Sequence, residues 1–383
     1  MQTVPYWLDY PYEARPALDS DVSADVCVIG AGVGGLSCAR ELALRGLGVV
    51  VLEERTAASG ASGRNGGFLL AGGAPFHLDA RERWGHEPAR RLYARTVEVQ
   101  GEVVELAASL GVADAVRPVG SLRLATSEEE ARHVRLHVDA LREDGFAAEL
   151  VERDELAPAL QGIGHAGCLV DHDAALQPAQ WIRALADDAE RAGARIFEGT
   201  HARLGNPVIA NGFEVRARHT VLAADGAVPT LVLNVRARRL HMVATAPLGE
   251  PVVDNLVYAR WGIEYFQQLP DGRIALGGFS DLDGDGSYTD REEGSPEVWA
   301  RLERYLRDDL GLTGAEITHR WVGVVGFSED QRPVAGRIHE GLYALGGYSG
   351  HGNLIGFIGG RAVAEEIATG QSEDLELLRL ADA

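Results

Sequence analysis

The fold of this chain is decided by residues 26–53, which read VCVIGAGVGGLSCARELALRGLGVVVLE. Residues 26–29 form a short apolar run rich in β-branched side chains, which is typical of a buried strand. A glycine-rich turn follows, and residues 36–44 repeat apolar side chains at helical spacing. A second apolar run, 49–52, leads into Glu53. The pattern predicts a strand, a tight turn, a helix and a second strand that ends at an acid.

Each part of this pattern has a physical reason. Gly30 permits the tight turn, Gly32 lets the backbone approach a pyrophosphate, and Gly35 lets helix and strand pack closely. The helix start offers free N–H groups and a partial positive charge to the phosphates. Glu53 follows Gly32 by 21 positions and can accept hydrogen bonds from both ribose hydroxyls. In this complete context the motif predicts a Rossmann-like dinucleotide-binding unit.

A second loop rich in glycine and serine covers residues 59–67, SGASGRNGG. Its backbone N–H groups are suited to binding phosphate and ring edges. Together with the first motif, the GASGRNGG wording resembles the FAD-dependent D-amino acid oxidase and glycine oxidase superfamily. It is most similar to the γ-glutamylputrescine oxidase branch of that superfamily.

A third glycine-rich segment lies near the end of the chain, where residues 346–353 read GGYSGHGN. It resembles the C-terminal signature of the same superfamily, in which the turn lies at the pyrimidine end of the flavin. N–H groups and a helix dipole aimed there stabilise the negative charge of a reduced flavin. His351 is the titrating side chain that the resemblance puts nearest the ring.

The resemblance implies an FAD that is bound without a covalent link, because the positions around Gly323 and Ser62–Arg64 offer neither a Cys nor a His for attachment. We expect catalytic roles for His351, Tyr265 and Arg64. The expected cofactor-binding residues are Gly30, Gly32, Gly34, Gly35, Glu53, Glu54, Arg55, Ser59, Gly60, Ser62, Arg64, Asn65, Gly66, Gly67, Ala202, Ala223, Ala224, Gly226, Gly347, Gly350, His351, Gly352 and Asn353.

The substrate pocket departs from the pattern of the amino-acid-oxidising members. They carry an arginine in a late strand and a second basic residue in a hairpin, and this chain has Val325 and Gln267 there. We therefore expect a pocket that does not bind an α-carboxylate, with Arg64 and Arg332 as substitutes if it does. Aromatic faces can hold an amine by cation–π attraction. The aromatic candidates are Tyr265, Phe266, Trp321 and Tyr348, for each of which core packing is the alternative.

The resemblance implies an FAD-dependent enzyme that oxidises the C–N bond of a small-molecule amine. Hydride passes to flavin N5, the imine hydrolyses, and O₂ is reduced to hydrogen peroxide. All 36 basic residues are arginine, so no lysine is present to assist O₂ or to form a Schiff base. Two alternatives stay open. One is an oxidase of glycine, sarcosine or a D-amino acid, and the other is a flavoprotein dehydrogenase subunit without oxidase activity.

The net charge of the chain limits the classes of molecule that it is expected to bind. The formal net charge of −21 argues against nucleic acid and anionic membranes, which attract basic faces, and is compatible with a cationic substrate. No apolar run approaches the roughly 18 residues of a membrane span. Residues 1–20 carry no signal-peptide pattern, so we expect a cytoplasmic protein. Cys27 and Cys38 lie in apolar segments and are expected to be buried free thiols.

The predicted fold class is α/β, with an α+β substrate domain. A Rossmann-like FAD-binding domain is built from segments 1–80, 151–230 and 329–383. An antiparallel-sheet substrate domain with covering helices takes segments 81–150 and 231–328. The antiparallel sheet is predicted from a run of strand-like segments and a hairpin turn at residues 269–272.

An acidic loop at residues 281–292 matches the spacing of a calcium-binding loop in full. Gly286 occupies the position of the sharp turn. A strand rather than a helix is expected before it, and a solvated acidic loop is the alternative. The expected ligands are Asp281, Asp283, Asp285, Ser287 and Glu292.

Overall fold

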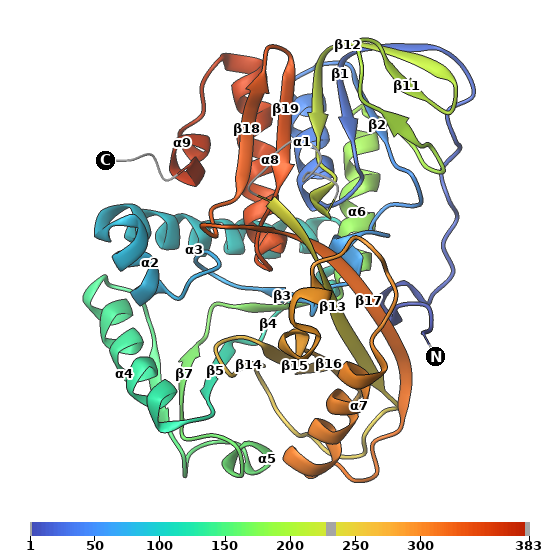
Figure 1. The fold of residues 1–383 in the computed structure, drawn as a ribbon. Coiled ribbons are helices and arrows are strands. Elements are labelled where there is room, and N and C mark those ends of the chain that lie inside the picture. Colours follow the sequence, from blue (N-terminus) through green and yellow to red (C-terminus); the bar gives the residue numbers. More distant parts are fainter. Residues whose placement is uncertain (1, 227–234, 380–383) are drawn as a thin grey trace.

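The computed structural model describes residues 2–226 and 235–379. Figure 1 shows the first sheet with helices α1 (Val33–Leu44) and α8 (Gly352–Thr369) in the upper half of the molecule and a second sheet in the lower half. The long helix α3 (His86–Ser109) runs between the two halves. The predicted mixed α/β fold class is confirmed.

The first sheet holds eight strands within the described residues. Strands β12, β1 and β2 run parallel, and β19 (Leu342–Gly346) adds to β12, also in parallel. β18 (Val334–His339) pairs antiparallel with β19. The other six strands of the sheet follow one another in space in the order β10 (Ala202–Arg203), β11 (Val208–Ala210), β12 (Phe213–Leu222), β1 (Val22–Ile29), β2 (Val49–Leu52) and β9 (Arg195–Phe197).

The central strands of this sheet are buried because helices cover it. All four residues of β2 are buried, as expected of a parallel strand with both faces covered. Helix α1 packs against both α8 and α6 (Pro178–Arg191). The approach of α8 to α1 is close, because a Cβ on Gly360 would overlap the carbonyl oxygen of Gly34. The strand–helix–strand unit predicted from residues 26–53 is confirmed.

The second sheet also holds eight strands within the described ranges. All neighbouring pairs are antiparallel except β14 and β5, which run parallel and depart from the expected antiparallel sheet. The strands, in spatial order, are β17 (Ile317–Ser328), β13 (Val235–Thr245), β16 (Ile274–Gly277), β15 (Glu264–Gln268), β14 (Leu256–Ala259), β5 (Ser121–Ala125), β7 (Ala166–Val170) and β6 (Glu149–Glu152).

Helices cover the second sheet as well. Helix α4 (Glu128–Glu143) packs on β5 and β7, while α7 (Pro296–Arg304) packs on β13. Helix α7 continues into a π-helical turn at Tyr305–Asp309. The other elements are the three-stranded sheet β3 (Phe68–Leu69), β8 (Ala174–Leu176) and β4 (Val116–Pro118), and helices α2 (His77–Trp84), α5 (Pro158–Gln161) and α9 (Glu373–Arg379).

The division into domains stays a prediction. The expected boundary between residues 230 and 231 lies outside the described residues. The boundary at residue 150 falls within β6, which pairs with β7 in the second sheet. No helix of the described ranges combines the length and the apolar character needed to cross a membrane.

Candidate functional site

A cavity of about 1060 Å³ opens at the carboxyl ends of β1, β2 and β12. Ligands bind at this edge of open α/β sheets. Eleven of the residues expected to bind the cofactor line it: Gly30, Gly32, Glu53, Glu54, Arg55, Gly60, Ser62, Ala202, Ala223, Ala224 and Gly226. Residues from separate parts of the sequence, which follow β1, β2 and β12, therefore line the same cavity.

The first glycines leave the backbone bare at this cavity. Gly30 has φ of 110°, and a Cβ there would lie 2.5 Å from the carbonyl oxygen of Ala223. A Cβ on Gly32 would lie 2.9 Å from the hydroxyl of Ser62, and one on Gly35 would overlap the carbonyl oxygen of Gly30. The N-cap residue Gly32 offers no side-chain cap, and the N–H of Val33 donates instead to the hydroxyl of Ser62 at 2.9 Å. Ser62 therefore lies at the helix start, which is where a pyrophosphate binds in such a unit.

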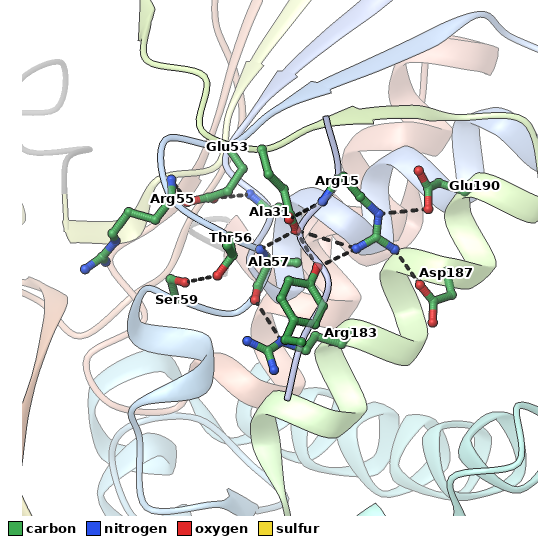
Figure 2. A network of polar contacts seen from close by, with 12 residues as sticks. Arg15, Ala31, Glu53, Arg55, Thr56, Ala57, Ser59, Arg183, Asp187 and Glu190 are labelled. Carbon is green, nitrogen blue, oxygen red and sulfur yellow. Dashed lines mark hydrogen bonds and ion pairs between the residues drawn. The ribbon is translucent and has the colours of Figure 1, made fainter. Parts of the chain in front are cut away.

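Glu53 is held in place by the backbone around it. One carboxylate oxygen accepts the N–H of Ala31 at 2.9 Å, and the other accepts the N–H of Arg55 at 3.0 Å (Figure 2). Burial raises the pKa of Glu53, and these two hydrogen bonds oppose the rise. The carboxylate is therefore fixed at the end of β2, where it faces the cavity.

A buried carboxylate, that of Glu198, holds the loop after β2 in place by hydrogen bonds. Glu198 accepts hydrogen bonds from the N–H of Ala57 at 2.7 Å and the N–H of Arg15 at 2.8 Å. The guanidinium of Arg15 in turn pairs with Asp187 and Glu190 on α6 (Figure 2). This network ties residues 15 and 57 together and so fixes one wall of the cavity.

The second glycine-rich loop meets the C-terminal turn. The amide of Asn65 donates to Asn353 at 3.1 Å, and the amide of Asn353 donates back at 3.0 Å. Asn353 also donates to the carbonyl oxygen of Phe68 at 2.8 Å. Asn65 accepts the N–H of Gly67 at 2.8 Å. Two segments that the sequence analysis treated separately therefore lie side by side at the start of α8.

His351 precedes α8 and has unusual surroundings. Both of its ring nitrogens are buried and lack a hydrogen-bond partner among the described residues. Burial, and after it the nearby charge of Arg123, lowers the pKa of His351 to about 4. The imidazole is therefore neutral at neutral pH and keeps one donor and one acceptor for a bound group.

One face of the second sheet turns toward this turn and loop. Tyr258 is paired in register with Tyr265, and the ring centroids of Tyr258 and His351 lie 6.3 Å apart. The ring of Tyr265 leaves no space for a side chain at Gly66, where a Cβ would lie 2.7 Å away. Trp321 donates its indole N–H to the carbonyl oxygen of Arg64 at 2.9 Å. An aromatic wall therefore adjoins the loop, the turn and His351.

Two of the aromatic candidates lie elsewhere. Phe266 packs in the core on the opposite face of the sheet, near Tyr305, because successive strand residues alternate between faces. Tyr348 is buried against α1, with its hydroxyl 2.9 Å from where a Cβ on Gly34 would stand. For these two residues, core packing is the correct interpretation.

Arg64 is engaged by the protein itself. Its guanidinium donates to the carbonyl oxygens of Ser59 at 2.7 Å and Val322 at 3.0 Å, and it pairs with Glu292 at 2.9 Å. Gln267 donates to the carbonyl oxygen of Gly66 at 2.7 Å. The catalytic role expected for Arg64 stays a prediction.

The calcium loop is not supported. Its acids turn toward arginines: Asp281 pairs with Arg260, Asp283 with Arg239, and Glu292 with Arg55 and Arg64. Ser280–Ser287 forms a 3-10 turn, and among residues 2–226 and 235–379 no three His, Cys, Asp or Glu side chains are grouped to hold a metal. Calcium needs carboxylates that converge, so the expected ligands Asp281, Asp283, Asp285, Ser287 and Glu292 do not form that site.

The sequence analysis missed two residues, Arg123 on β5 and Tyr258 on β14. They are paired in register on neighbouring strands, so their side chains share the face that carries Tyr265. The only signal was alternation, because Arg123 stands between Leu122 and Leu124. Alternation is read as a strand with one solvated face, and only the folded chain shows what covers Arg123.

The cavity and the joined loops fit FAD. The glycines and the Ser62 hydroxyl at the start of α1 suit a pyrophosphate, Glu53 suits a ribose, and His351 lies in the turn that the resemblance puts at the ring. All three cysteines are buried, and burial raises the pKa of Cys27 to about 12 and that of Cys168 to about 11. The expectation that Cys27 and Cys38 are buried free thiols is confirmed.

Comparison with protein families gives one match of nearly full length. The model described as "DAO: FAD dependent oxidoreductase" matches residues 25–366. Among curated proteins, the probable oxidoreductase OrdL of Rhizobium meliloti (strain 1021) is 28% identical over 95% of this chain and 87% of its own length. The gamma-glutamylputrescine oxidoreductase of Escherichia coli (strain K12) is 27% identical over 92% of this chain and 86% of its own length.

Solved structures share the fold. Glycine oxidase from Geobacillus kaustophilus superposes with a TM-score of 0.78 at 21% identity, covering 94% of this chain and 98% of that one. L-proline dehydrogenase from P. horikoshii superposes with a TM-score of 0.74 at 22% identity, covering 95% of this chain and 96% of that one.

Proposed function

The chain belongs to the DAO family of FAD-dependent oxidoreductases, and we propose that it oxidises the C–N bond of a small-molecule amine. The observation that carries the proposal is the meeting of the 59–67 loop, the C-terminal turn and the aromatic wall. Asn65 bonds to Asn353, Gly66 lies against Tyr265, and Tyr258 lies against His351. The similarity to the gamma-glutamylputrescine oxidoreductase of Escherichia coli supports an amine as substrate.

The chain's own residues bind and orient the reactants. The start of α1 faces the phosphates together with the hydroxyl of Ser62, which accepts the N–H of Val33, and Glu53 faces the ribose. Bound FAD supplies the hydride acceptor at its N5 and an electron store that a second acceptor empties. Tyr258 and Tyr265 hold the amine by shape and cation–π attraction. Neutral His351 offers one hydrogen bond to the substrate or the ring edge and keeps positive charge away from the amine.

The test is an anaerobic titration of the purified, yellow protein with a panel of amines and amino acids. We expect an amine to bleach the flavin absorbance near the visible maximum, and the Tyr265→Leu variant to bleach more slowly with the same FAD content. Tyr6→Leu is the control, because Tyr6 bonds to Asp271 and does not line the cavity. A panel in which no amine or amino acid bleaches the flavin would overturn the proposal.

The electron acceptor is a separate question. O₂ is the proposed acceptor, with hydrogen peroxide as the product. A dehydrogenase that passes electrons elsewhere is the second candidate, favoured by a sequence of 383 residues that contains no lysine to assist O₂. Reoxidation of the bleached protein in air separates the two, because an oxidase regains its colour within seconds and forms one peroxide per turnover.

The FAD is proposed to be non-covalent, since the three cysteines are buried free thiols in core clusters. Acid precipitation should leave the yellow colour in the supernatant. Colour retained in the washed pellet would contradict this part of the proposal.

A further inference from the structure

Arg123 carries a charge that the protein does not neutralise. Within residues 2–226 and 235–379 it forms no ion pair, and its Nη1 is buried without a hydrogen-bond partner. Among the described residues its guanidinium stacks on Phe76, with Cζ 4.3 Å from the centre of that ring. The side chain is partly buried, and a buried guanidinium N–H without an acceptor is costly, so Arg123 is suited to a partner that arrives from outside the chain.

The position of Arg123 joins it to the candidate site. It is paired in register with Tyr258, whose ring contacts His351, and Tyr258 is paired in turn with Tyr265. The charge of Arg123 is close enough to help lower the pKa of His351. Three buried nitrogens without partners, one on Arg123 and two on His351, therefore lie on either side of Tyr258.

Buried Asp173, which bonds to Ser121 on β5, is already engaged by other donors. It accepts hydrogen bonds from the N–H of Ala71 at 2.8 Å, the amide of Gln100 at 2.7 Å and the hydroxyl of Ser121 at 2.6 Å. Three neutral donors therefore take most of its acceptor sites. The Phe76 ring holds the guanidinium plane but supplies no acceptor for its N–H groups.

We propose that Arg123 binds a carboxylate of the substrate, so that the enzyme oxidises an amine that also bears a carboxyl group. The inference rests on the proposed function and deepens it. A planar guanidinium matches a carboxylate with two parallel hydrogen bonds. Arg123 then supplies from β5 the carboxylate contact that Val325 and Gln267 do not provide, so this proposal departs from the expectation of a pocket that binds no α-carboxylate.

The experiment measures binding without turnover. Oxidised, FAD-loaded protein is titrated with benzoate, with its neutral isostere benzamide and with phenyl phosphate, and binding is followed by calorimetry and by the flavin spectrum. We expect benzoate to bind and benzamide to bind at least tenfold more weakly. Arg123→Gln should weaken benzoate by roughly tenfold to a hundredfold, as loss of a charged hydrogen bond does, and Arg123→Lys should restore part of the loss.

The control is Arg320→Gln on β17, which removes an arginine of the same sheet that pairs with Glu303. It should leave benzoate binding unchanged. For a carboxylated amine found in the substrate panel, Arg123→Gln should raise KM far more than it lowers kcat.

Three results would overturn the inference. They are no benzoate binding to the parent protein, equal binding of benzoate and benzamide, and phenyl phosphate binding in place of benzoate, which would indicate a phosphate site. The benzoate and benzamide comparison uses the parent protein, so it stands even if Arg123→Gln fails to fold. A panel that bleaches no flavin while benzoate binds through Arg123 would sink the proposed function and leave the carboxylate site intact.

Discussion

Asn65 and Asn353 exchange a reciprocal pair of amide hydrogen bonds of 3.1 and 3.0 Å across 288 positions of sequence. One residue lies in the loop that follows the dinucleotide unit and the other begins the last long helix. Each side chain makes further bonds to backbone, to Gly67 and to Phe68. The pair therefore holds the two glycine-rich segments at the distance at which both can face one flavin.

Replacing Asn353 by Ala tests that pair. The variant loses the donors to Asn65 and to the carbonyl oxygen of Phe68, and leaves partly buried acceptors unpaired. We expect a loss of about 1–3 kcal/mol in the free energy of unfolding and a weaker hold on FAD. Denaturant unfolding and FAD content after gel filtration measure the two effects. Asn255→Ala, which removes a bond to the carbonyl oxygen of Val119, should lower stability but keep the FAD.

The glycine spacing of the first turn predicts a contrast between two Gly→Ala changes. At Gly35 a Cβ would overlap the carbonyl oxygen of Gly30, so Gly35→Ala should cost about 1–3 kcal/mol and reduce FAD uptake. At Gly101, on the exposed side of α3, a Cβ meets nothing within 4 Å. Gly101→Ala should therefore raise stability by about 0.5–1 kcal/mol. Equal melting temperatures for the two variants would contradict the packing described for the first turn.

His351 predicts a pH dependence of stability. Its pKa falls from an ordinary value near 6.5 to about 4 in the folded chain, so the unfolded chain binds the proton more tightly. The contribution of His351 is complete above pH 6.5 and is lost as the pH falls toward 4. The melting temperature of the parent should thus fall more steeply than that of His351→Gln between pH 6.5 and 4. Parallel curves for the two proteins would show that the imidazole is not buried in its neutral form.

Glu292 lines the cofactor cavity and pairs with both Arg55 and Arg64. A carboxylate beside bound phosphates repels them and occupies two cations. We expect Glu292→Gln to lower the Kd of the FAD-free protein for FAD several-fold in low-salt buffer, with the difference shrinking as salt is added. Quenching of FAD fluorescence measures it. Glu293→Gln is the matched control, since its side chain forms no ion pair within the described part of the chain, and an equal effect there would reject the local explanation.

The dinucleotide unit could be predicted from sequence because its signals are local. Residues 26–53 carry the strand, the turn and the acid in one stretch, and the demand on Gly35 comes from Gly30, five residues earlier in the chain. The turn at 269–272 is of the same kind, and the N–H of Gly272 donates to the carbonyl oxygen of Leu269 at 2.8 Å as expected of a tight hairpin. Short-range geometry was enough in both cases.

The substrate side could not be predicted in the same way. Tyr265 and Phe266 are adjacent and equally aromatic, yet one faces the site and the other faces α7. The proposed role of Arg123 depends on its stacking on Phe76 and on the lack of an ion-paired acid in the described part of the chain, and both are set by tertiary packing. The calcium prediction failed for a related reason, because spacing alone does not say which arginines will reach the acids first.

Strand β19 pairs with β12, and helix α8 packs on α1. These two late contacts have a consequence for biosynthesis. These two elements leave the ribosome well after β1 and α1, because they follow them far along the sequence. During translation the nascent dinucleotide unit therefore stays without its final strand and helix, with an unpaired edge on β12 and a glycine-lined surface on α1. A chain that stalls before residue 342 is left in that state, and it is a target for chaperones and proteases rather than a partly working enzyme.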